Sequence, residues 1–90
     1  EAWRALEVRF RRHFERQHRD RGQSWDVPRE AYEVGLRLAW DSRGKPFRSF
    51  HDLEDLARMR WESTEFGDTP YRHVRDSVIY AWEEGRLAFA

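Results

Sequence analysis

Glu15 and His18 have the types and spacing closest to a catalytic motif, since they form a Glu-x-x-His unit on a predicted helix. Di-iron carboxylate proteins use two such units, with two further carboxylates, inside a four-helix core. The second unit is missing here: Glu62 corresponds to Glu15 in an internal repeat, but Glu65 stands where a second histidine is required. We therefore expect Glu15 and His18 on a charged surface, and we predict no metal or other cofactor.

Other catalytic signatures are also missing from the sequence. There is no cysteine, which excludes a thiol nucleophile, a disulfide and a thiolate metal site. No Ser or Thr stands beside a predicted base, and no Gly-rich phosphate loop occurs. The acidic residues near His51 stand where a helix dipole favours carboxylates without a metal. His13 and His73 are expected to be partly buried and hydrogen-bonded. The sequence favours a protein that is not an enzyme.

A row of arginines on the first predicted helix is the main candidate for contacting a phosphate backbone. The four arginines are spaced i, i+3, i+7 and i+10, opposite the apolar stripe of the helix: Arg9, Arg12, Arg16 and Arg19. Four engaged charges would give a salt slope of about −3.6 on duplex DNA. The net charge is zero, whereas nucleic-acid binders usually have a basic field. A solvated face is the preferred interpretation, and nucleic-acid binding is the alternative function.

Charge is distributed unevenly although the total is neutral. Residues 1–22 contain seven arginines and four acidic residues, whereas residues 47–68 contain six acidic residues and three arginines. These segments hold the first helices of two predicted repeats. The opposite excesses indicate either attraction between these two helices or head-to-tail packing of copies.

An internal repeat predicts the architecture. A shift of 47 positions aligns the pattern of the first predicted helix with residues 50–62, and a shift of 42 aligns the second predicted helix with the fourth. The clearest matches of the second shift are Asp26, Pro28, Ala39 and Trp40 with Asp68, Pro70, Ala81 and Trp82. A duplicated hairpin implies that neither half buries its apolar face alone. We therefore predict an all-α, four-helix single domain over residues 1–90, made of two pseudo-twofold-related α-hairpins at about residues 1–41 and 49–86.

Helix signals refine this prediction. We expect helices at 3–21 and 26–41, with Asp26 as an N-cap, and two more that begin near Ser49 and Thr69, the last ending at Gly85. Five Trp, six Phe and three Tyr are enough aromatic residues to form the core. Trp40 and Trp82 are both expected to be largely buried. Small residues at the matched positions 35 and 77 indicate that the second and fourth helices cross closely.

Core and turn residues over about residues 8–84 form a recognisable pattern: Phe10, Phe14, Trp25, Ala31, Tyr32, Gly35, Leu38, Ala39, Asp41, Phe50, Leu53, Arg60, Trp61, Glu62, Val74, Val78, Trp82 and Glu83. This pattern resembles a bacterial aromatic-rich tandem helical-hairpin domain found in uncharacterised, stress-related proteins. Phe50 stands where the relatives have Trp. The resemblance implies a bacterial accessory domain and transfers no catalytic or ligand-binding residue.

Apolar residues that remain after the core is assigned are the candidate partner-binding surface. They lie away from the main apolar stripes of their helices: Val34, Leu38, Met59, Ile79 and Tyr80. If they form one patch, they mark an interaction surface, and a homodimer through the second and fourth helices is its simplest use. The predicted function is a non-enzymatic protein-interaction or self-association module in the cytoplasm. No segment is long and apolar enough to span a membrane.

Overall fold

The computed structural model describes residues 2–18, 25–45 and 49–89, and these residues form an all-α fold. Over these ranges the elements are four α-helices and a short 3-10 helix: α1 (Ala2–His18), α2 (Asp26–Asp41), η1 (Phe50–Leu53), α3 (Glu54–Glu62) and α4 (Tyr71–Ala88). The predicted fold class is confirmed. None of the described helices meets the length and apolarity that a membrane span requires.

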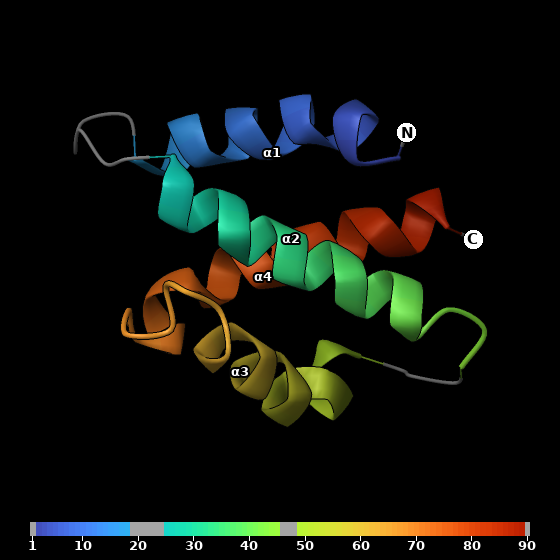
Figure 1. The fold of residues 1–90 in the computed structure, drawn as a ribbon. Coiled ribbons are helices and arrows are strands. Elements are labelled where there is room, and N and C mark those ends of the chain that lie inside the picture. Colours follow the sequence, from blue (N-terminus) through green and yellow to red (C-terminus); the bar gives the residue numbers. More distant parts are fainter. Residues whose placement is uncertain (1, 19–24, 46–48, 90) are drawn as a thin grey trace.

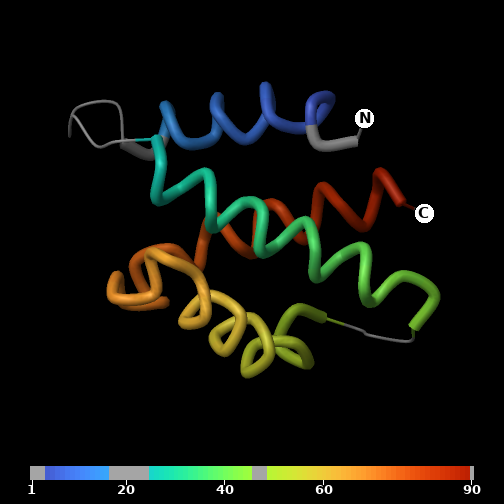
Figure 2. The backbone as a smooth tube through the Cα atoms, viewed as in Figure 1, coloured from blue at the N-terminus to red at the C-terminus, as the bar shows by residue number. Residues whose placement is uncertain are grey.

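The helices are arranged in three layers. α2 and α4 pack against each other in the middle, with α1 on one side of this pair and α3 on the other (Figure 1). The tube in Figure 2 shows that α1 and α3 run in one direction and that α2 and α4 run in the opposite direction. A helix in the middle layer must bury two faces, which explains why α2 is apolar around most of its circumference.

Gly35 allows α2 and α4 to approach closely. A Cβ atom at this position would lie 2.2 Å from the main-chain oxygen of Val78 and 2.9 Å from the Cβ of Ala81. Ser77, the residue matched to Gly35 in the repeat, is also buried. The predicted close crossing of the second and fourth helices is confirmed. Glycine is required at position 35 because any larger side chain would clash with the backbone of α4.

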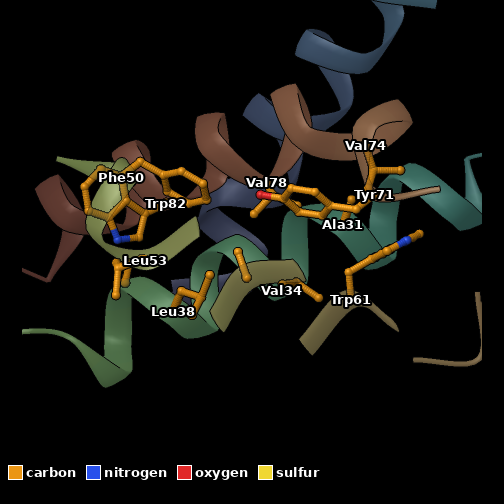
Figure 3. Packing of buried hydrophobic residues seen from close by; sticks show 12 residues of the cluster. Ala31, Val34, Leu38, Phe50, Leu53, Trp61, Tyr71, Val74, Val78 and Trp82 are labelled. Atoms are coloured by element: carbon orange, nitrogen blue, oxygen red, sulfur yellow. The ribbon is translucent and has the colours of Figure 1, made fainter. Parts of the chain in front are cut away.

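The core consists of two clusters, one on each side of the middle layer. The larger cluster joins α2 and α4 to α3 and η1, and Figure 3 shows Trp61 and Trp82 at its two ends. The smaller cluster joins them to α1 through Leu6, Phe10 and Phe14. Tyr32 belongs to this second cluster and stacks on Phe10 with ring centroids 5.0 Å apart.

The expected burial of Trp40 is wrong. Trp82 is 2% exposed and packs edge-to-face on Phe50, whereas Trp40 is 48% exposed and packs edge-to-face on Phe89. The sequence repeat equates these two positions, but their neighbours differ because α4 extends past Gly85 and places Phe89 beside Trp40. A twofold relation between the hairpins stays a prediction.

Several predicted helix ends also differ from the structure. Trp25, not Asp26, occupies the N-cap of α2, and Pro70 takes that position in α4. Ser49 makes no side-chain capping hydrogen bond, because the segment after it begins as the 3-10 helix η1. Gly85 lies inside α4, since this helix continues to Ala88. The predicted stop of the first helix lies outside the described residues.

Candidate functional site

The predicted apolar patch does not exist as one surface. Val34 and Leu38 are buried against α3 and are part of the larger core cluster. Ile79 and Tyr80 are partly buried and pack against different clusters, on opposite sides of the middle layer. Met59 alone of the five is strongly exposed. The prediction treated α2 as having a single buried face, whereas its central position buries two. The same layering removes the basis for a homodimer through α2 and α4.

The arginine row lies on α1 as predicted, over the residues that the structure describes. Arg9 donates to Glu84 of α4 at 2.8 Å, so this guanidinium holds α1 against α4. Arg12 and Arg16 are exposed, and no carboxylate of the described residues lies within ion-pair distance of either. Arg19 lies outside the described residues. Two of the four arginines therefore form an available basic face.

Of the Glu-x-x-His unit, the structure describes the Glu15 side chain only. Glu15 is exposed and lies 3.9 Å from Arg11, and the His18 side chain lies outside the described residues. Over those residues, no group of three or more His, Cys, Asp or Glu side chains is placed to hold a metal ion.

A buried polar group lies between α1, α2 and α4. Nδ1 of His13 is 2.7 Å from the hydroxyl of Tyr32, and the hydroxyl of Ser77 also hydrogen-bonds Tyr32. The imidazole of His13 stacks on Tyr80 with ring centroids 4.0 Å apart. The expectation for His13 is confirmed, whereas the same expectation for His73 is wrong because His73 is exposed on the first turn of α4. These contacts satisfy polar groups inside the core, so we interpret them as structural.

Tyr32 should make the domain sensitive to alkali. Burial raises the pKa of Tyr32 to about 12, although the hydrogen bond with Ser77 acts to lower it. Since the unfolded tyrosine ionises near pH 10, its stabilising effect is complete below pH 10 and is lost between about pH 10 and 12. Over this pH interval, we expect the free energy of unfolding of the wild type to fall by about 2 to 3 kcal/mol more than that of Tyr32→Phe. Urea unfolding at a series of pH values measures this difference, and parallel pH profiles of the two proteins would contradict it.

Glu54 links α3 to α4. It accepts hydrogen bonds from the hydroxyl of Tyr71 and from Arg75 Nε, the latter at 2.8 Å. Burial acts to raise the pKa of Glu54, but the hydrogen bonds from Tyr71 and Arg75 outweigh it and lower this pKa. Burial and the same hydrogen bond raise the pKa of Tyr71. The carboxylate thus prefers to stay ionised, which stabilises this contact above the usual pKa of a glutamate and weakens it in acid.

A surface hollow lies over the last two turns of α2. It has a volume of about 540 Å³ and is lined by Leu36, Arg37, Trp40, Asp41, Arg60 and Phe89. Leu36 is buried at its base, whereas the Trp40 ring is half exposed at the surface. A half-exposed tryptophan next to a second aromatic ring is a common feature of protein-binding surfaces.

Arginines surround the aromatic rings of the hollow. The Arg43 guanidinium lies 3.5 Å from the centroid of the Trp40 ring and donates to the Trp40 carbonyl at 2.7 Å. Arg60 of α3 donates to Asp41 at 2.6 Å, and Arg37 lies 3.4 Å from Glu33. With three arginines and two carboxylates, the site has a small positive excess and fits an acidic ligand with an apolar side chain.

This hollow was not predicted from the sequence, because the last helix was expected to end at Gly85. A signal was available: Ala81, Gly85 and Phe89 continue one i, i+4 row, and helical continuation brings the last of them beside α2. A Cβ on Gly85 would lie 2.6 Å from the Cβ of Ala39, so this glycine is explained by helix packing rather than by a helix end.

No protein-family model, no curated protein and no solved structure matches this chain. The protein is therefore classified by its own structure. It is a small three-layer all-α domain with a tryptophan at its surface that is surrounded by arginines.

Proposed function

We propose that this domain is a non-enzymatic protein-interaction module whose hollow over α2 binds an acidic segment of a partner protein. The observation that carries this proposal is the exposure of the Trp40 ring. Trp40 is 48% exposed, whereas Trp82, its matching residue in the second repeat, is buried. Leaving a tryptophan at the surface forgoes stabilisation of roughly 2 kcal/mol or more, a cost that binding a partner offsets. A cytoplasmic location in a bacterium belongs to the same proposal: the lack of cysteine fits a reducing compartment, and the bacterial origin comes from the sequence resemblance.

Charge selects the kind of partner. Arg37 and Arg60 line the hollow and Arg43 lies over Trp40, so carboxylates of a bound peptide would find guanidinium groups beside the aromatic rings. Guanidinium groups bind carboxylates through paired hydrogen bonds, while the rings accept an aliphatic or aromatic side chain. An acidic peptide with one large apolar residue meets both requirements, whereas a basic peptide is repelled.

We expect synthetic acidic peptides with a central Leu or Phe to shift the NMR signal of the Trp40 indole N–H. Matched peptides with Lys in place of each acidic residue should leave this signal unchanged. Trp40→Ala should abolish binding, and Arg37→Glu should weaken it about tenfold, since a lost charged contact contributes roughly 1.5 kcal/mol. Arg72→Glu, at the other end of α4, is the control and should bind as the wild type does. Failure of every acidic peptide to give a saturable shift would contradict the proposal.

A further inference from the structure

The opposite charges of α1 and α3 are directed away from each other. The two helices lie on opposite sides of the α2–α4 layer (Figures 1 and 2). Neighbouring helix axes are about 8–10 Å apart, so two such steps separate the outer faces by well over the Debye length of about 8 Å at physiological salt. Attraction between α1 and α3 of one molecule is therefore negligible. The charge asymmetry was expected to indicate either attraction between these two helices or packing of separate copies. Contact between separate molecules is the explanation that remains.

The outer face of α1 combines arginines with one exposed apolar residue. Val8 is 56% exposed near its centre, and three arginines lie along the same face, Arg4 one turn before Val8, and Arg12 and Arg16 one and two turns after it. Glu15 also lies on this face, 3.9 Å from Arg11. The face is therefore basic, with a small apolar centre.

The outer face of α3 and η1 has the complementary composition. Met59 is 63% exposed near its centre, and acidic side chains surround it: Asp52, Asp55 and Glu62. Asp55 is 3.5 Å from Arg58, but its side chain is 97% exposed, so its carboxylate remains accessible to a second partner. This face is therefore acidic with a small apolar centre, whereas the outer face of α1 is basic with a small apolar centre.

The order of residues favours one relative direction, because that direction forms the most opposed pairs. If α1 of one copy lies antiparallel to α3 of another, four opposed pairs form at similar intervals along the helices: Arg4 with Glu62, Val8 with Met59, Arg12 with Asp55, and Arg16 with Asp52. The paired positions are four residues apart on α1 and three or four residues apart along η1 and α3, about 4.5 to 6 Å, so one register brings all four pairs close together. In the parallel direction with Val8 facing Met59, Arg4 would face Asp55 and Arg12 would face Glu62, but Arg16 would extend past the end of α3, so one charge pair is lost.

We propose that copies of this domain associate head to tail, with the outer face of α1 packed antiparallel on the outer face of α3 of the next copy. A single molecule cannot offer both faces to the same neighbour, because they lie on opposite sides. The contact is thus heterologous, and it produces open chains or rings rather than a closed twofold dimer. This surface is separate from the hollow over α2, so the proposal does not rest on the proposed function.

Charge reversal tests this contact by sedimentation velocity. At low salt, the sedimentation coefficient of the wild type should rise from micromolar to millimolar concentration, and it should return to the monomer value in molar salt. The double variants Arg4→Glu/Arg12→Glu and Asp55→Arg/Glu62→Arg should each stay monomeric. Their equimolar mixture should associate, because acidic and basic faces then lie on different molecules. Circular dichroism verifies that both variants retain the wild-type helix content.

Arg37→Glu/Arg72→Glu is the matched control. It changes the net charge by the same amount as the α1 variant but leaves α1 and α3 unaltered, so it should associate as the wild type does. It also removes an arginine of the hollow, so its association shows that the two surfaces act independently. Wild-type protein that is monomeric at all concentrations, or a mixture that fails to associate, overturns the proposal. So does a monomeric wild type that co-sediments with mixed-sequence duplex DNA through Arg4 and Arg12, since the face would then bind nucleic acid.

Cross-linking tests whether the outer faces of α1 and α3 meet at Val8 and Met59. The chain has no cysteine, so Val8→Cys and Met59→Cys each introduce a single thiol. Under oxidation, the mixture of these variants should give a disulfide-linked dimer that contains one copy of each. Val8→Cys mixed with Arg72→Cys should not. Equal cross-linking in the two mixtures would contradict the contact between α1 and α3.

Discussion

Gly35→Ala is expected to destabilise the domain severely, although alanine is the better helix former. The added methyl would lie 2.2 Å from the Val78 oxygen, more than 1 Å inside normal contact, so α2 and α4 would have to move apart. Both core clusters depend on this helix pair, and they would loosen together. Overpacking of about 3 kcal/mol or more outweighs the helix-propensity gain of about 1 kcal/mol. We expect a net loss of at least about 2 kcal/mol in urea unfolding.

Two controls sharpen this experiment. Adding Ala81→Gly to Gly35→Ala removes the second contact but not the first, because the nearest atom belongs to the backbone; rescue should therefore be incomplete. Arg37→Ala, on the exposed side of the same helix, should change stability by less than about 0.5 kcal/mol. If Gly35→Ala matches or exceeds wild-type stability, α2 and α4 do not approach as closely as this structure places them.

Trp82→Ala should destabilise the domain far more than Trp40→Ala, even though the two positions are equivalent in the repeat. Trp82 is buried against Phe50, and its removal leaves a cavity that should lower stability by about 3 to 5 kcal/mol. Since a domain of this size has a stability of roughly 5 to 10 kcal/mol, that loss approaches complete unfolding. Trp40→Ala should lower stability by about 1 kcal/mol, because half of this side chain is already in water.

Thermal and urea unfolding of both variants measure this contrast, with circular dichroism as the probe. Trp61→Ala serves as a positive control, since Trp61 is fully buried and its indole N–H donates to the Thr69 carbonyl at 2.7 Å. Equal losses for Trp40→Ala and Trp82→Ala would show that the burial follows the sequence repeat. They would also remove the exposed tryptophan on which the proposed hollow depends.

Much of the fold could be predicted from local patterns. Apolar residues at helical spacing located all four helices, and the predicted bounds of the second one agree with α2. The residues of η1 were assigned to the third helix, since a 3-10 turn and the first turn of an α-helix share nearly the same apolar spacing. Leu56 of α3 is 39% exposed, although the adjacent Ala57 is fully buried.

The candidate sites were harder to predict than the helices. Periodicity shows which residues share a helix face, but it does not show how many faces a helix buries. Val34 and Leu38 were therefore assigned to a surface, although α3 covers them. Trp40 was assigned to the core for the converse reason: its repeat partner is buried, and equivalence in sequence does not ensure equivalent neighbours.

By itself the sequence determined that this protein is an all-α domain with an aromatic core, because helical spacing and the helix-forming tendency of each segment are local properties. The small residue at position 35 also predicted the close crossing of the second and fourth helices, and the sequence showed the excess of arginine on the first helix and of acidic residues on the third. Only the tertiary structure decided that α2 and α4 form the middle layer and that the two charged helices face away from each other. Exposure and charge separation depend on how the layers stack, which is set by contacts between residues far apart in the chain.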